Sequence, residues 1–147
     1  MIDIFEGARA STRCHRFVIY LPTKRKDGTP VEGFEQLASA AEELICRRLG
    51  GVTSYPACGA FIRDTGQLQR EHIQVLESFS SEDAWREHSP FLGRLAKLLA
   101  RELDQESIAC SLDGEMALAT PDEHAPRQIP NLKHCTAAIL ERLLKNS

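Results

Sequence analysis

The run Phe17-Val18-Ile19-Tyr20-Leu21 is the feature that most constrains the fold, because β-branched, aromatic and aliphatic side chains follow one another without interruption. Such a run is typical of a strand, and Pro22, which cannot donate to a strand ladder, limits it. Its nearly continuous apolar character predicts a central strand whose two faces are both covered. A chain built around this strand therefore needs other strands on both of its edges.

Apolar residues recur at intervals of three and four over residues 34–49, with acidic Glu32 and Glu35 at the start and Arg47 and Arg48 near the end. This periodicity predicts an amphipathic helix, and the end charges suit its dipole. Gly50-Gly51 supplies the left-handed conformation that ends such a helix.

Two extended segments, Gly59–Arg63 and Gln67–Phe79, flank the tripeptide Asp64-Thr65-Gly66. A short loop that ends in glycine between two such segments predicts a β-hairpin. The tripeptide also occurs in aspartic proteases, where two such loops place two carboxylates together. Arg63 before it and the helices around it favour a hairpin turn instead.

A second helical region begins at Ser80, since a carboxylate follows three residues later at Asp83. Ser89-Pro90 predicts a break, because proline disfavours helix at the residue before it. We expect a short helix up to about His88 and a longer helix up to Asp104.

The rest of the chain shows three segments. Residues 107–119 alternate on both sides of Asp113-Gly114, which predicts a last strand or a hairpin. Residues 120–130 hold three prolines and no periodicity, as expected of a connecting segment. Residues 132–145 form an amphipathic helical pattern, which must bury its apolar side on its own domain or on a partner.

The order strand, helix, strand, strand, helix, strand resembles the ferredoxin-like sandwich over roughly residues 15–119. The stretch Gly50-Gly51-Val52-Thr53, then Gly59-x-Phe61, Gly66 and Glu71 is also similar to small bacterial domains of unknown function. The resemblance implies an α+β fold, a ferredoxin-like βαββαβ two-layer sandwich with an antiparallel sheet, here with an additional C-terminal helix.

We expect one domain over residues 1–147. It consists of an N-terminal extension (1–15), the sandwich (16–119), the connecting segment (120–130) and the C-terminal helix (131–147).

Composition narrows the environment and the partners. The net charge is −3, so nucleic-acid binding is disfavoured, although a basic cluster over residues 13–26 leaves it as a weaker hypothesis. Five cysteines without a C-x-x-C motif indicate a reducing compartment, and no apolar segment is long enough for a signal or a membrane span. We expect a cytoplasmic protein that does not contact membranes.

Three side chains are candidate catalytic residues: Glu71, His72 and Tyr20. Glu71 shares parity with Ile73 and Val75, a parity that we expect to face the helices, so its carboxylate would lie at the edge of the core as a general base. Pairing with an arginine, or a place at the solvated end of the strand, is the structural alternative.

A metal site is not expected. Cys14-His15 and His134-Cys135 could meet as zinc ligands, but adjacent residues point in different directions and no short-range ligand pair is present. We expect no cofactor. Trp85, the only tryptophan, could cover a pocket, although closing one end of the core is the commoner role of a tryptophan.

Two functional hypotheses remain. The first is a non-catalytic binding or interaction module, a homodimer with a small-molecule or protein ligand, because one face of a sheet with helices on its other face needs a cover. The alternative is a small enzyme of the cofactor-independent oxygenase or isomerase type, with a pocket between sheet and helices and Glu71 as its base.

Overall fold

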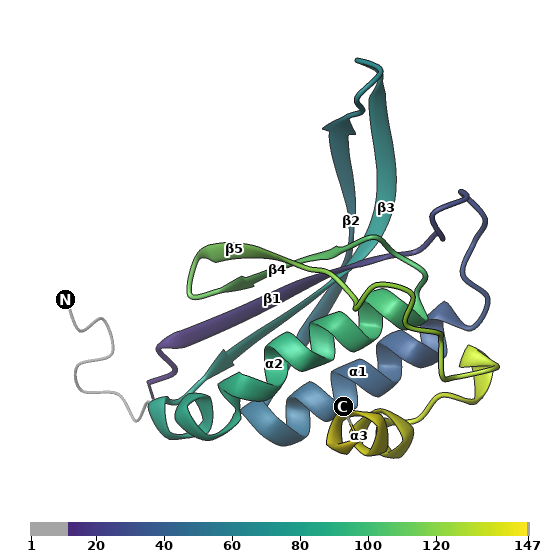
Figure 1. Cartoon of the computed structure of the whole chain (residues 1–147). Coiled ribbons are helices and arrows are strands. Elements are labelled where there is room, and N and C mark those ends of the chain that lie inside the picture. The colour runs from purple at the N-terminus through teal and green to yellow at the C-terminus, as the bar shows by residue number, and fades with distance from the viewer. Residues whose placement is uncertain (1–11, 147) are drawn as a thin grey trace.

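The computed structural model describes residues 12–146, in which helices cover one face of an antiparallel sheet (Figure 1). The strands are β1 (His15–Pro22), β2 (Thr53–Ile62), β3 (Leu68–Ser80), β4 (Ile108–Leu112) and β5 (Glu115–Ala119). Their order across the sheet is β2-β3-β1-β4-β5, and every neighbouring pair is antiparallel. The α+β class and the antiparallel sheet are thus confirmed.

The sheet has one strand more than the four expected. Asp113 and Gly114 both have positive φ, 52° and 88°, as a two-residue hairpin turn requires, and the turn returns the chain as β5. β5 pairs with β4 from Glu115 to Ala119 and forms one edge of the sheet. The expected four-stranded sandwich is corrected accordingly.

β1 is the central strand, as its apolar run predicts, with β3 on one edge and β4 on the other. Phe17, Ile19 and Leu21 are fully buried in the core that the sheet shares with the helices. Val18 is also buried but belongs to the opposite face, outside that core. On that opposite face Val18 is buried among neighbouring side chains, whereas Tyr20 is half-buried and Arg16 is exposed.

Helix α1 (Phe34–Leu49) has the predicted bounds and packs its apolar side under the sheet. It ends where Gly50 adopts φ 101° and donates its N–H to the Cys46 carbonyl at 2.9 Å. At its start Gly33 has φ 82°, and a Cβ there would lie 2.5 Å from the Lys133 backbone nitrogen. Glycine at position 33 is thus required by both its conformation and its neighbour.

β2 and β3 form the predicted hairpin, which extends beyond the helix layer (Figure 1). Asp64-Thr65-Gly66 is its turn, with φ 84° at Gly66. β2 is longer than expected and begins at Thr53, before Pro56. Proline is tolerated there because β2 is an edge strand.

Helix α2 (Glu82–Glu102) is continuous, so the predicted break at Pro90 is wrong. Proline inside a helix costs about 3 kcal/mol or more, because a hydrogen bond is lost and the ring is crowded. Three neighbours on the same helix, Phe91, Leu92 and Leu95, are buried in the core. Each such burial contributes about 1.5–3 kcal/mol, so together they outweigh the penalty.

The C-terminal helix is shorter than predicted. A 3-10 turn, η1 (Leu132–His134), precedes α3 (Ala137–Lys145), whose first turn is capped by the Thr136 hydroxyl accepting the Ile139 N–H. α3 packs against α1 and α2 with Leu140 and Leu144 buried. It therefore extends the helix layer and leaves the other face of the sheet uncovered by helices.

Among residues 12–146, no helix combines the length and the hydropathy needed to cross a bilayer. Most of the N-terminal extension expected over residues 1–15 lies outside the described residues, and His15 already begins β1.

Candidate functional site

The face of the sheet that points away from the helices, here called the outer face, is defined by one row of paired residues. Thr53, Glu77, Val18, Ser111 and Met116 lie opposite one another on the five strands in turn. Because paired residues share a face and Val18 lies outside the core, the whole row points outward. Met116 is 61% exposed, so the β5 side of this face carries bare apolar surface.

Aromatic side chains gather on the outer face. Tyr20 on β1 and Tyr55 on β2 are both paired with Val75 on β3, so they lie on either side of it. Arg16 donates from Nε to Glu77 Oε2 at 2.8 Å, and its guanidinium carbon lies 5.9 Å from the centre of the Phe79 ring. The outer face thus offers planar apolar surface beside an ion pair.

Register also places two of the candidate catalytic residues on this face. Phe17, Ile19 and Leu21 are paired with Ser78, Leu76 and Gln74, so the even-numbered positions of β3 face the helices. The expectation that the odd-numbered positions do so is therefore wrong. Glu71, like Val75, points to the outer face and shares that face with Tyr20.

Glu71 is half-buried on the projecting hairpin, opposite Gly59 of β2. A Cβ at Gly59 would lie 3.6 Å from Glu71 Cγ, so the glycine leaves space beside this side chain. His72 lies on the other face, with its Nδ1 3.8 Å from Cys58 Sγ. Glu71 and Tyr20 therefore share one face of the sheet, with Glu71 four residues along β3 from the partner of Tyr20, and His72 lies on the other face.

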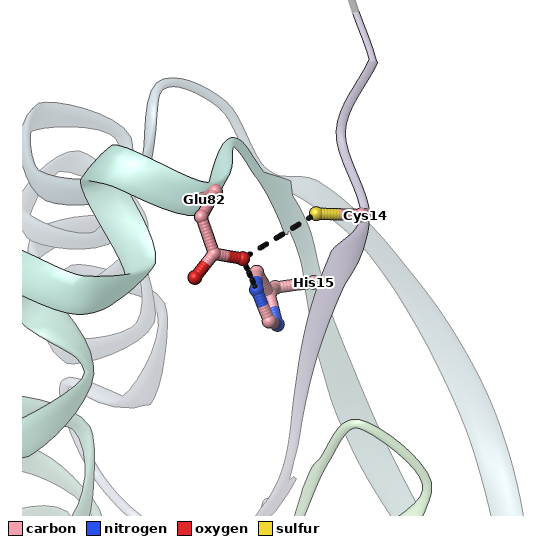
Figure 2. A group of neighbouring side chains, drawn as sticks. All are labelled: Cys14, His15 and Glu82. Atoms are coloured by element: carbon pink, nitrogen blue, oxygen red, sulfur yellow. Dashed lines mark hydrogen bonds and ion pairs between the residues drawn. The ribbon is translucent and has the colours of Figure 1, made fainter.

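A second group of reactive side chains lies where β1 begins and α2 starts. It consists of Cys14, His15, Glu82, Trp85 and Asp113 and is called the His15 cluster below. His15 Nδ1 lies 2.7 Å from Asp113 Oδ2, and its Nε2 lies 2.5 Å from Glu82 Oε2. Cys14 Sγ lies 3.9 Å from the same Glu82 oxygen, as Figure 2 shows. Trp85 stacks on the imidazole with ring centres 4.9 Å apart and planes 4° from parallel.

Charges within the His15 cluster support one another. The hydrogen bonds with Asp113 and Glu82 raise the pKa of His15 above its ordinary value. Donation to both carboxylates requires the doubly protonated imidazolium. The hydrogen bond from His15 lowers the pKa of Glu82. At Asp113 slight burial raises the pKa, but the hydrogen bonds from His15 and the Arg16 amide lower it, and the net shift of the Asp113 pKa is downward. The three pKa shifts all favour the charged forms of His15, Glu82 and Asp113.

Sequence reasoning missed the His15 cluster, because its members come from residues 14–15, 82–85 and 113. The Asp113-Gly114 turn was recognisable locally, and so was a helix start at Ser80 with Asp83, although the structure caps α2 one residue later, at Ser81. Only the pairing of β1 with β4, and the helix that follows β3, bring the two carboxylates to one histidine.

Two hollows lie on the described part of the chain, one between α2 and the β4–β5 hairpin and one between two helices. One, of about 460 Å³, borders the His15 cluster and is lined by Trp85, Ser89, Pro90, Leu112, Asp113 and Glu115. The other, of about 590 Å³, lies between α1 and α3. Large fully buried side chains such as Phe17, Leu44 and Leu95 fill the space between sheet and helices. The hollow beside Trp85 lies at the edge of this filled space, between α2 and the β4–β5 hairpin, and Trp85 both packs against the core and borders it.

Comparison with solved structures finds the same fold in a phage enzyme. A phage SAM lyase in complex with S-methyl-5'-thioadenosine matches with a TM-score of 0.56 and 16% identity, covering 80% of this chain and 97% of that one. A phage SAM lyase in the apo state matches with a TM-score of 0.50 and 16% identity, covering 76% and 92%. A Bacillus cereus protein related to NIF3 matches at 0.39 over 26% of its length and supports no argument. No family model and no curated protein matches the chain.

At 16% identity these likenesses show the fold. The two phage structures, covered over nearly their whole length, are enzymes, and this finding speaks against the leading hypothesis from the sequence, the non-catalytic binding module. The enzyme alternative is the better supported of the two.

Proposed function

We propose that this protein is an enzyme of the lyase type that cleaves a sulfonium nucleoside related to S-adenosylmethionine, with Glu71 as its general base. The observation that carries the proposal is the match to a SAM lyase bound to S-methyl-5'-thioadenosine, which covers 97% of that chain. The proposal keeps the enzyme alternative and its base, Glu71, but replaces the oxygenase or isomerase reaction with that of a lyase.

The outer face suits such a substrate chemically. An adenine ring stacks on aromatic side chains, and Tyr20 and Tyr55 lie on either side of Val75 on this face. A sulfonium cation is attracted to aromatic faces and to carboxylates, which Glu71 supplies on the same side of β3. Tyr20 would therefore position the substrate, and Glu71 would lie near its sulfonium end.

The proposed reaction needs no co-reactant. The Glu71 carboxylate removes a proton from the carbon next to the one bonded to sulfur, and a carbon–carbon double bond forms. The carbon–sulfur bond breaks and its electron pair stays on sulfur, which leaves a neutral thioether and an unsaturated amino acid. The proton remains on Glu71 until solvent takes it. The third candidate, His72, faces the other side of the hairpin and has no part in this step.

We also infer the finer fold assignment and an assembly. β1, α1, β2, β3, α2 and β4, in this order and with both helices on one face, correspond to a ferredoxin-like unit that β5 extends. The bare apolar side chains on the β5 side, Met116 and Leu118, would be covered by a second copy. The homodimer of the sequence analysis thus stands as part of this proposal.

The test is to incubate the purified chain with S-adenosylmethionine and to measure S-methyl-5'-thioadenosine by chromatography. Glu71→Gln should lower the rate by about 10²–10⁴-fold, the usual contribution of a general base. Glu106→Gln, at an exposed position outside the outer face, is the matched control and should keep the rate. Absence of the thioether product with the wild-type chain would refute the lyase proposal. A saturated second product, or an unchanged rate in Glu71→Gln, would refute only the role of Glu71.

A further inference from the structure

We propose that the His15 cluster binds a divalent transition-metal ion of the zinc type through Cys14 Sγ, His15 Nε2 and the Glu82 carboxylate. These three ligand atoms all lie within 4.8 Å of one another, and Figure 2 shows the three side chains converging on one point. The site is distinct from the outer sheet face and does not depend on the lyase proposal.

The spacing requires only a small adjustment to admit an ion. Zinc lies about 2.0–2.1 Å from nitrogen or oxygen and about 2.3 Å from sulfur, so tetrahedral ligand atoms lie about 3.3–3.6 Å apart. Cys14 Sγ and Glu82 Oε2 are 3.9 Å apart, while His15 Nε2 and the same oxygen are 2.5 Å apart. Glu82 is in the first turn of α2, and its side chain is 56% exposed. Rotation of this side chain therefore opens the space without moving the backbone.

Independent support comes from the other nitrogen of the imidazole. His15 Nδ1 donates to Asp113 Oδ2 at 2.7 Å, and Asp113 in turn accepts the Arg16 backbone N–H at 2.7 Å. Histidines that bind metals usually donate their second nitrogen to such a carboxylate, which fixes the tautomer with the free electron pair on the metal side. The parallel stacking of Trp85 holds the ring plane as well. Nε2 is thus oriented before an ion arrives.

The donor set selects the ion. One thiolate, one imidazole and one carboxylate favour zinc and its neighbours in the transition series over magnesium and calcium, which prefer oxygen alone. On binding, the ion replaces the proton at His15 Nε2 and the proton of the Cys14 thiol, and both protons leave to solvent. Cys14 is exposed, so its sulfur is accessible to the ion.

Three protein ligands leave one tetrahedral position for water or a solute, as in catalytic rather than structural zinc sites. The ion would join the start of β1 to the first turn of α2 and, through Asp113, to the turn between β4 and β5. Because these segments are far apart in sequence, an ion bound only to the folded chain stabilises it by mass action.

The experiment titrates Co²⁺ alone into the full-length chain after chelator treatment and follows the thiolate-to-cobalt absorption band, with Zn²⁺ as competitor. We expect one ion per chain and a melting temperature that rises with ion concentration. Cys14→Ser should abolish the band, and Glu82→Gln should weaken binding by about 100-fold or more. Asp113→Asn, which removes only the support of the imidazole, should weaken binding about 10–100-fold.

Cys58→Ser is the matched control, because Cys58 also lies beside a histidine, 3.8 Å from His72 Nδ1, but belongs to none of the groups of potential metal ligands in residues 12–146. It should leave the band unchanged. Circular dichroism checks that each ion-free variant is folded. Cys14→Ser should remain folded, because it changes an exposed side chain. The absence of stoichiometric Co²⁺ binding would overturn the proposal. A band that disappears in Cys58→Ser but remains in Cys14→Ser would overturn it as well.

Discussion

Glu102 at the end of α2 provides the sharpest test of how the connecting segment is held. Its side chain is fully buried, and its carboxylate accepts the backbone N–H groups of Gln128 and Ile129 at 2.8 and 2.6 Å. Arg101 Nε donates to the second oxygen at 2.8 Å. One carboxylate therefore ties two successive amides of the segment between β5 and η1 to the helix.

Substitution Glu102→Ala takes the acceptor from three donors at once: the Gln128 and Ile129 amides and Arg101 Nε. Each buried amide left without a partner costs about 1–3 kcal/mol. Arg101, only 16% exposed, also loses its counter-charge, and breaking a buried pair costs about 3–5 kcal/mol in total. Relief of the desolvated carboxylate offsets part of this sum, so we expect a loss of about 3–5 kcal/mol. For a chain of 147 residues this lowers the melting temperature by on the order of 10 °C.

Urea unfolding followed by circular dichroism measures the loss, and hydrogen exchange at the Gln128 and Ile129 amides locates it. Glu102→Gln, which keeps one acceptor oxygen, should lose about half as much. Glu106→Ala, at an exposed position, should stay within about 0.5 kcal/mol of the wild type. A loss below about 1 kcal/mol in Glu102→Ala would refute the reasoning, since water would then be replacing the carboxylate.

Two further predictions concern the backbone and the assembly. Gly33→Ala should destabilise the chain by about 2–4 kcal/mol in urea unfolding, because position 33 has a positive φ and a Cβ there would meet the Lys133 backbone. Gly28→Ala is the control, with φ 86° but open space around the position, and should cost only about 1–2 kcal/mol. Equal losses in the two variants would contradict the close approach at Gly33. Light scattering should give the mass of two chains for the wild type and of one for the double variant Met116→Lys with Leu118→Lys, since charge on the outer face opposes its burial. A wild-type mass of one chain would refute the dimer.

Local patterns in the sequence determined most of the elements. The apolar run at residues 17–21 predicted a central strand, the periodicity over 34–49 predicted α1 with its glycine end, and two glycine-containing turns predicted the hairpins. Each of these signals depends on neighbours within a few residues, where backbone preference and apolar periodicity act directly. The predicted break at Pro90 is wrong because local signals do not include tertiary burial. Phe91, Leu92 and Leu95 are buried in the core that α2 shares with the sheet, and this burial keeps the helix continuous.

Tertiary structure alone decided which face each side chain occupies and which distant residues meet. The sequence did not decide whether the odd-numbered residues of β3, Glu71 among them, face the helices or the outer side. The pairing of core residue Phe17 with Ser78 sets the even-numbered residues toward the helices and Glu71 on the outer face. His15, Glu82 and Asp113 have no local relation, since residues 15 and 113 are joined by strand pairing and residue 82 by the helix that follows β3. A chain's periodicity specifies that a face exists, whereas register and packing specify what lies on it.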